Sequence, residues 1–306
     1  MPHKTLPVVS IITPSFNQGE FIEQTINSVL TQDYPNIEYI IIDGGSTDNT
    51  IDILKKYNSQ IKWLSEKDNG QSDAINKGFK MTEGEIIYWL NSDDIILPGT
   101  ISSIVAEYNK KPDVDVIYGK CHFTDTSDKI IGQYPTEPFN LKRLAMFNFI
   151  CQPSTFFKRD AYFKIGCLNE KLQYAMDYDL WIRMAQKFKF HYVPEYFSCY
   201  KLHEASKTVD SKQAMANNKE TLEVVLEHFK WAPANRVFSY YLQLTENKIR
   251  KFCSPHKLFS IPVALLISTV QYLRLNKRIA KEDIKAINLS YIKKIFINWN
   301  DLYKHY

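Results

Sequence analysis

The sequence predicts an α/β protein with a mostly parallel central sheet flanked by helices, followed by a helical C-terminal extension. Short apolar runs typical of buried strands alternate with segments of helical period from residue 8 to residue 90. Acidic and amide residues follow three of these runs, at the strand ends where open α/β sheets bind ligands. Because strands that alternate with helices pair in parallel, we expect helices on both faces of the sheet.

The N-terminal elements follow from these patterns in order. Apolar runs rich in Ile and Val predict the strands, and apolar residues three and four positions apart predict the helices. Pro35 breaks the first helical pattern, and the polar turn from Asp43 separates the second strand from the second helix. The predicted order is strand 8–12, helix 20–30, strand 38–42, helix 50–57, strand 61–64, helix 72–81 and strand 86–90.

The alternation loosens beyond residue 94, which predicts mixed strand directions. The expected elements are a helix near 100–110, strands near 114–118 and 129–134, a loop-rich stretch at 136–153, a helix at 179–187 and a strand at 190–193, after which residues 196–201 lead into His203. From about Ala214 the pattern is helical throughout. We therefore expect an α/β domain of residues 1–213 and a basic helical extension of residues 214–306.

The composition limits the class of protein. The chain has 306 residues, of which 44% are apolar and 24% charged, an ordinary globular balance. Its 5 cysteines are scattered and show no CxxC pair, so neither a disulfide framework nor a zinc site is indicated. The N-terminal apolar run is too short for a signal-peptide core. We expect a cytoplasmic protein.

Acids and amides follow three predicted strands, at 14–17, 43–48 and 91–94. Because the carboxyl ends of parallel strands share one edge, these side chains are expected to line a single site. Asp93 and Asp94 are adjacent carboxylates, and Mg²⁺ is usually held by one or two carboxylates together with substrate phosphates. The edge therefore predicts a metal-bound diphosphate. Taken singly, each segment is equally typical of a polar turn or a helix cap.

The segment from Asp68 to Asp73 is expected at the same edge, and it contains Gln71. Ser72 or Asp73 at the start of the following helix is also a normal N-cap. There is no GxGxxG or GxxxxGK[ST] loop, so the dinucleotide and P-loop interpretations lose their main support.

Asp177 is the best candidate for a general base. It is predicted to stand just before a helix, where a carboxylate can cap the helix and still face the site. Capping alone is the plain alternative, and Asp179 pairs with Arg183 one turn on. His203 is more often structural than a ligand, but a neutral imidazole can complete a shell of carboxylates and phosphates around a metal.

At these residues the chain resembles a family 2 glycosyltransferase with the Rossmann-like GT-A fold, over roughly residues 7–210. The resemblance depends on the order of several motifs, each of which is weak alone. The motifs are Val9-Ser10-Ile11-Ile12-Thr13-Pro14-Ser15-Phe16-Asn17, Asp43 to Asp48, Asn69 to Gly78, Asn91 to Asp94, and Asp177 with Trp181.

The resemblance implies an inverting enzyme that uses a nucleotide-diphosphate sugar and Mn²⁺ or Mg²⁺. Asp94 would bind the metal, with His203 assisting it, and Asp177 would be the base although Met176 replaces an acid common in the family. Gly44 replaces a second acid that commonly contacts uracil, so UDP is favoured without being fixed. The implied nucleotide-sugar contacts are Pro14, Phe16, Asn17, Asp43, Gly44, Gln71, Asp73, Asn91 and Asp93, and the implied acceptor or sugar contacts are Gln152 and Trp181.

The resemblance also suggests an acceptor, because family members of the bacterial envelope type use glycan or lipid-linked hydroxyls. Two rival interpretations remain. A binding module could keep the fold without turnover, since fold alone does not fix function. A sugar nucleotidyltransferase would share the acids, but it expects a cationic loop after the first strand, and Pro14 to Gly19 carries no cation.

The C-terminal extension is strongly basic. Residues 230–306 contain 14 Lys and Arg against 4 Asp and Glu, a net charge of +10, whereas residues 1–229 contain 24 against 30, a net charge of −6. Cations such as Arg274 and Lys294 alternate with apolar residues such as Leu265, a pattern typical of helices that lie on a membrane surface. We expect peripheral attachment to an anionic membrane. The alternatives are a solvated extension or a homo-oligomer contact, and nucleic acid is not expected.

Overall fold

The computed structural model describes residues 6–203, 206, 213–252, 257–281 and 283. It separates into two compact units. The first unit consists of Met1–Asn140 and Phe149–His203, and the second of Leu141–Asn148 and Glu204–Tyr306. The short segment 141–148 therefore groups with the C-terminal helices, and the division of the chain at residue 213 stays a proposal.

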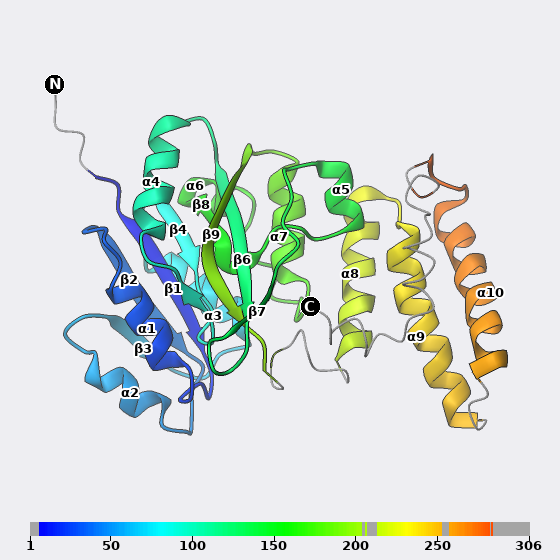
Figure 1. The fold of residues 1–306 in the computed structure, drawn as a ribbon, viewed down its shortest axis with the longest axis horizontal. Coiled ribbons are helices and arrows are strands. Elements are labelled where there is room, and N and C mark those ends of the chain that lie inside the picture. Colours follow the sequence, from blue (N-terminus) through cyan, green and yellow to red (C-terminus); the bar gives the residue numbers. More distant parts are fainter. Residues whose placement is uncertain (1–5, 204–205, 207–212, 253–256, 282, 284–306) are drawn as a thin grey trace. The chain divides into compact units, whose positions relative to one another are not determined.

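The first unit is built on one mixed sheet (Figure 1). Its strands lie in the order β3-β2-β1-β4-β8-β6-β9-β5, and β7 pairs with β6. The bounds are β1 Val9–Ser15, β2 Ile37–Asp43, β3 Lys62–Ser65, β4 Ile86–Trp89, β5 Ile95–Ile96, β6 Val116–Thr124, β7 Ile130–Gln133, β8 Thr155–Lys158 and β9 Phe190–Lys201.

Strand directions decide which loops share an edge. Strands β1 to β4 are parallel, and the register sets Ser15 beside Asp43 and Asp43 beside Ser65. Strand β8 is antiparallel to both β4 and β6, and β9 is parallel to β6. The ends of β6 and β9 therefore lie on the same edge of the sheet as the ends of β1, β2, β3 and β4.

Helices cover both faces of this sheet. They are α1 Ile22–Leu30, α2 Thr50–Lys56, α3 Gln71–Lys80, α4 Thr100–Lys110, α6 Arg159–Lys164 and α7 Met176–Ala185, with a 3-10 turn, η1, at Gln152–Ser154. One face buries apolar residues of α1, α2 and α4, such as Ile26, Leu54 and Ile104. On the other face, aromatic rings of α3, α6 and α7 pack against Trp89 and Phe157. The site edge is thus supported by packed helices on both sides.

The expected fold class is confirmed, and the first seven elements lie within three residues of their predicted bounds. Four differences stand out. The segment 155–164, which received no predicted element, forms β8 and α6, and the stretch predicted as loops contains the helix α5 Leu141–Met146 and η1. Strand β9 extends beyond its predicted end at Val193 to Lys201. Helix α7 begins three residues earlier than expected, so Asp177 lies inside its first turn and Ala175 is the N-cap.

The second unit is helical, as expected from about Ala214 onward. Helix α9 (Ala234–Phe252) packs against both α8 (Ala214–Phe229) and α10 (Lys257–Asn276). The side chain of Asn276 bonds both the N–H and the carbonyl of Ala232, each at 2.8 Å. Among the described residues, no helix has the length and apolar content needed to cross a bilayer. Lys294 lies outside the described residues.

One face of α10 is apolar and exposed. Val263, Leu266, Val270 and Leu273 are 44–67% exposed, and they recur at the spacing of a single helical face. Ala264, Ser268 and Tyr272 are buried. Arg274, Lys277 and Arg278 are exposed at the C-terminal end of this helix and just beyond it.

Candidate active site

Asp43 is the last residue of β2, and its side chain organises the loop that follows. Its side chain is fully buried, and its Oδ2 accepts hydrogen bonds from the backbone N–H groups of Gly45 and Ser46 at 3.1 and 2.9 Å and from the Ser65 hydroxyl at 2.7 Å. The Ser46 hydroxyl donates to the other oxygen at 2.5 Å. A carboxylate has about four acceptor sites. Both oxygens of Asp43 are therefore bonded by its surroundings, and the side chain holds the loop in shape.

Asn17 joins the loops after β1 and β2. Its backbone is left-handed, with φ of 53°, a conformation that Asn tolerates better than most residues. Its N–H donates to the Ser46 hydroxyl at 2.7 Å, and its side-chain oxygen accepts from the Thr47 N–H at 2.8 Å. Pro14 lies within β1, and the ring of Phe16 is 59% exposed beside it. Phe16 thus presents an aromatic surface at this edge.

The paired acids after β4 meet the end of β9. Asp93 Oδ2 lies 3.0 Å from His203 Nε2, and the ring of His203 packs on Phe21. Asp94 is fully buried; its Oδ1 accepts from the Lys201 N–H at 3.1 Å and its Oδ2 from Asn91 Nδ2 at 3.1 Å. Burial raises the pKa of Asp94 well above its usual range, and the neighbouring charge of Asp93 raises it further. The structure thus brings Asp93, Asp94 and His203 together.

The donor set fits a divalent cation that is shared with a substrate. Among the described residues, no three His, Cys, Asp or Glu side chains form a complete metal-binding group. Asp93 and His203 nevertheless face each other across 3.0 Å, and Asp94 adjoins them as a buried carboxylate whose charge has little solvation. Carboxylate oxygens with one imidazole suit Mn²⁺ or Mg²⁺ when diphosphate oxygens supply the remaining positions.

Three amides form a chain across the same edge. Gln71 Nε2 donates to Asn91 Oδ1 at 2.8 Å, and Asn91 Nδ2 donates to Gln152 Oε1 at 2.9 Å. Gln152 in turn donates to the carbonyl of Trp89 at 2.7 Å. The structure therefore brings Gln71, Asn91 and Gln152 together. An aspartate at position 91 could make neither of the two donations that Asn91 makes.

Asp177 lies in the first turn of α7. The Tyr178 N–H donates to its Oδ1 at 2.7 Å, and the Ser72 hydroxyl bonds the sulfur of Met176, which joins α7 to α3. The pKa of the buried Cys151 thiol is raised first by burial and by its contact with Cys121, and then by the charges of both Asp94 and Asp177. Asp94 and Asp177 are therefore both close enough to Cys151 to act on it electrostatically.

Two candidate residues have local structural roles. Asp73 accepts hydrogen bonds from the Asn69 N–H at 3.0 Å and from its side chain at 3.3 Å, and these bonds shape the start of α3. Trp181 is fully buried, and its ring stacks on Trp89 with centroids 5.6 Å apart. The structure thus places the Trp181 ring in the core, and its expected contact with the sugar or acceptor stays a prediction.

Sequence reasoning missed a buried ion pair that anchors this edge. Lys201 Nζ bonds Asp128 Oδ1 at 2.8 Å and Gln24 Oε1 at 2.7 Å, while the lysine side chain is only 3% exposed. Asp128 has a left-handed backbone, with φ of 64°, in the turn between β6 and β7. The one available signal was a lysine two residues before His203, at the end of a predominantly aromatic strand segment.

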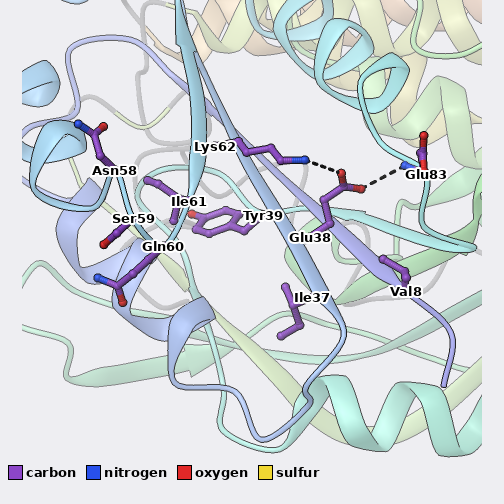
Figure 2. A pocket seen from close by; sticks show the side chains of 10 residues that line it. All are labelled: Val8, Ile37, Glu38, Tyr39, Asn58, Ser59, Gln60, Ile61, Lys62 and Glu83. Atoms are coloured by element: carbon purple, nitrogen blue, oxygen red, sulfur yellow. Dashed lines mark hydrogen bonds and ion pairs between the residues drawn. The ribbon is translucent and has the colours of Figure 1, made fainter. Parts of the chain in front are cut away.

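A cavity of about 500 Å³ lies elsewhere, at the amino ends of the parallel strands (Figure 2). Its one half-buried acid, Glu38, is occupied by the Ser10 hydroxyl, Lys62 and the Glu83 N–H. None of the candidate site residues lines this cavity. Parallel sheets bind ligands at the opposite strand ends, so we assign no function to it.

The comparisons with known proteins agree with the fold. The family model described as "Glycosyl transferase family 2" matches residues 10–165. An uncharacterised glycosyltransferase of Rickettsia felis is 26% identical over 309 residues, which is 96% of this chain and 49% of the relative. Chondroitin synthase of Escherichia coli is 26% identical over 193 residues, which is 62% of this chain and 28% of the relative. The chain thus spans about half the length of the rickettsial relative.

Two solved structures share the fold. Residues 1–349 of TarS from S. aureus, in complex with UDP-GlcNAc, align with a TM-score of 0.61 and 17% identity, over 88% of this chain and 79% of that one. The mannosyltransferase PcManGT from Pyrobaculum calidifontis, in complex with GDP-Man and Mn²⁺, aligns with a TM-score of 0.57 and 15% identity, over 94% of this chain and 86% of that one.

Proposed function

Because the chain belongs to glycosyl transferase family 2, we propose that it is an inverting, metal-dependent glycosyltransferase. It transfers a sugar from a nucleotide-diphosphate sugar, with UDP the favoured nucleotide, to a hydroxyl of a glycan or lipid-linked acceptor. The observation that carries the proposal is the meeting of Asp93, Asp94 and His203 at the edge where the loops after β1, β2 and β3 also end.

Asp177 is the proposed base. It lies in the first turn of α7, where the Tyr178 N–H donates to its Oδ1 at 2.7 Å, and its charge, like that of Asp94, raises the pKa of the buried Cys151 thiol. It accepts the proton of the acceptor hydroxyl as that oxygen attacks the anomeric carbon from the face opposite the diphosphate. A single displacement inverts the anomeric centre. Base catalysis of this kind typically contributes about 10²–10⁴-fold in rate.

Asp93, Asp94 and His203 are the residues that would hold the cation. When bound, Mn²⁺ or Mg²⁺ neutralises the negative charge that grows on the leaving diphosphate. The backbone N–H of Lys201 and the side chain of Asn91 keep the Asp94 carboxylate in place. The side-chain amides of Gln71 and Gln152 both bond Asn91 beside these acids. Gln71 is proposed to contact the nucleotide sugar, and Gln152 the sugar or the acceptor.

The acceptor and the location are proposed from supporting observations. Chondroitin synthase is a relative that builds a polysaccharide, which favours a role in envelope polysaccharide synthesis. The exposed apolar face of α10, with Arg274, Lys277 and Arg278 near its end, favours peripheral attachment to the cytoplasmic face of an anionic membrane. A lipid-linked acceptor would lie in that membrane.

The test is hydrolysis of a panel of UDP-, GDP- and dTDP-sugars with and without Mn²⁺. We expect Mn²⁺-dependent release of one nucleotide from the parent chain and none from Asp94→Ala. Asp94→Asn keeps the shape of the buried side chain, so it separates loss of the metal ligand from misfolding. The control is Asp113→Asn, which removes an exposed acid far from the site.

Nucleotide binding without hydrolysis, and without transfer to any acceptor supplied, would contradict an enzyme and favour a nucleotide-sugar binding module. Release of pyrophosphate from a sugar phosphate and a nucleoside triphosphate would favour a nucleotidyltransferase instead.

A further inference from the structure

The acid that ends β2 is not presented to a nucleotide. Asp43 accepts hydrogen bonds from Gly45, Ser46 and Ser65, and its side chain is fully buried. The other acid of this turn, Asp48, is tied to the backbone, because its carboxylate accepts from the N–H groups of Gly19 and Thr50, each at 3.0 Å. The position after Asp43 is Gly44, which has no side chain. If a carboxylate contacts the base at this edge, it therefore comes from another segment.

The carboxylate of Asp68 occupies the space beside Gly44. A Cβ atom on Gly44 would stand 2.7 Å from Asp68 Oδ2 and 3.0 Å from its Cγ. Gly44 does not have a positive φ, so a larger residue here would meet the side chain of Asp68, which would have to shift, and not a strained backbone conformation. An acid from the loop after β3 thus stands where an acid at position 44 would have stood.

The geometry of Asp68 suits recognition of a ligand. Its Oδ1 accepts a hydrogen bond from the Gly70 N–H at 2.9 Å, which fixes the side chain. Its Oδ2 accepts no hydrogen bond from the described residues, and the side chain is half-buried. The two loops are in close contact, because a Cβ on Gly45 would lie 3.6 Å from the Lys67 nitrogen. Asp68 therefore holds one oriented acceptor at the nucleotide edge.

We propose that Asp68 determines base specificity by accepting a hydrogen bond from a ring N–H of the nucleotide base. This inference rests on the proposed function. Uracil, thymine and guanine carry a ring N–H at the base-pairing edge, whereas cytosine and adenine carry a lone pair there. A fixed carboxylate oxygen accepts from the first group and repels the second. The donor is therefore a uridine, thymidine or guanosine diphosphate sugar.

The experiment is calorimetric titration of UDP, dTDP, GDP, CDP and ADP, each with Mn²⁺, into the full chain. We expect the parent to prefer a nucleotide with a ring N–H. Asp68→Ala should weaken binding of that nucleotide about tenfold or more, because a hydrogen bond to a charged group is lost. CDP and ADP binding should hardly change, so the preference should collapse.

Glu66→Gln is the matched control, because it also removes one negative charge from this loop but its side chain bonds Lys77. It should leave the base preference intact. The double variant Gly44→Asp, Asp68→Ala moves the carboxylate to the other loop, and it should restore the preference that Asp68→Ala loses.

Equal loss of affinity for all five nucleotides in Asp68→Ala would assign Asp68 to loop structure alone and overturn the inference. An unchanged base preference in Asp68→Ala would also overturn it, while leaving the proposed function intact. A parent chain that binds none of the five nucleotides would overturn the proposed function and this inference together.

Discussion

At the scale of single residues, the site depends on carboxylates that differ in how they are satisfied. Asp43 is held by hydrogen bonds from its own loop and from Ser65 of β3, whereas the buried Asp94 receives two hydrogen bonds from the described residues. Asp93 meets an imidazole. A carboxylate whose oxygens are already hydrogen-bonded suits a structural role. A buried carboxylate with few hydrogen bonds is stabilised most by a nearby cation, because burial disfavours its charge. Residue type alone does not distinguish these roles.

Asp177→Asn tests the base. The substitution keeps the shape of the side chain but removes the proton acceptor, so we expect donor binding to persist and turnover to fall by about 10²–10⁴-fold. Donor affinity is measured by titration and turnover by nucleotide release with acceptor present. Near-normal turnover would contradict the assignment of Asp177.

Asn91→Asp tests the amide chain. The variant loses two donations, to Asp94 and to Gln152, and adds a third negative charge beside Asp93 and Asp94. We expect it to lower the free energy of unfolding without metal by about 1–3 kcal/mol, and Mn²⁺ to recover part of that loss. Thermal unfolding with and without Mn²⁺ measures both effects.

Asn58→Asp is the control for that measurement, because Asn58 is exposed and an aspartate there can still accept the bond from Trp63. A loss that Mn²⁺ leaves unchanged would speak against a cation at Asp93 and Asp94.

At the scale of elements, the end of β9 is held by the buried pair of Lys201 and Asp128, to which Gln24 of α1 also bonds. This anchor links α1, the turn between β6 and β7, and the strand that carries His203. Burial of Asp128 raises its pKa, but hydrogen bonds from Lys201 and Gln24 and the charge of Lys201 outweigh that effect, so the pKa is lowered. The anchor therefore contributes stability while Asp128 is ionised.

Replacing Asp128 and replacing Lys201 should lower the free energy of unfolding by different amounts. Asp128→Ala leaves a buried ammonium without its carboxylate partner, and we expect it to cost about 1–2 kcal/mol. This is less than for a fully buried pair, because the Asp128 side chain is 40% exposed. Lys201→Met leaves a carboxylate that water can solvate, and it should cost less. Urea unfolding measures the difference, with Asp113→Ala, from an exposed pair, as control.

The pH dependence has a definite sign. A lowered pKa in the folded chain means that this stability is present above the unfolded value of about 3.9 and is lost as the pH falls through the folded value. The gap between the parent and Asp128→Ala should therefore close on acidification below about pH 4. A gap that stays constant down to pH 2 would contradict the ion pair.

How far the sequence predicts the structure differs between elements. The alternation up to Trp89 carries strong periodicity, and its elements were found where expected. Strand β8 consists of four residues between η1 and α6, too short to show a period. Helix α7 starts earlier than predicted: its N-cap is Ala175, which makes no side-chain cap hydrogen bond and so gives no capping signal in the sequence. The contacts of Lys201 and Asp68 join segments far apart in the chain, which a local pattern does not encode.

At the scale of the molecule, the charge is divided along the chain. Residues 1–229 carry a net −6 and the rest a net +10. On α10 the exposed apolar face is followed by three cations, and each Lys or Arg near an anionic surface contributes roughly 1 kcal/mol to attachment. The proposed membrane contact therefore combines apolar insertion with charge attraction.

Leu266→Glu with Val270→Glu tests this contact. The pair places two acids on the apolar face, so we expect binding to vesicles of phosphatidylglycerol and phosphatidylcholine to fall at least tenfold, as measured by co-sedimentation. Ile130→Glu, at an exposed isoleucine of β7, is the control and should bind like the parent. The membrane proposal would be contradicted if the parent chain did not bind these vesicles, or if it bound neutral vesicles equally well. Either result would favour a solvated extension or an oligomer contact.

The pairing of Asp93 with His203 spans 110 residues of chain. During synthesis on a ribosome, β1 to β4 can pair with one another once β4 has emerged, because these pairings all lie within residues 9–89. The Lys201 N–H and the His203 imidazole reach the acids only after β9 has been made and has joined β6. Until then a nascent chain holds two adjacent acids without these partners, so the proposed site for the diphosphate is completed late in translation.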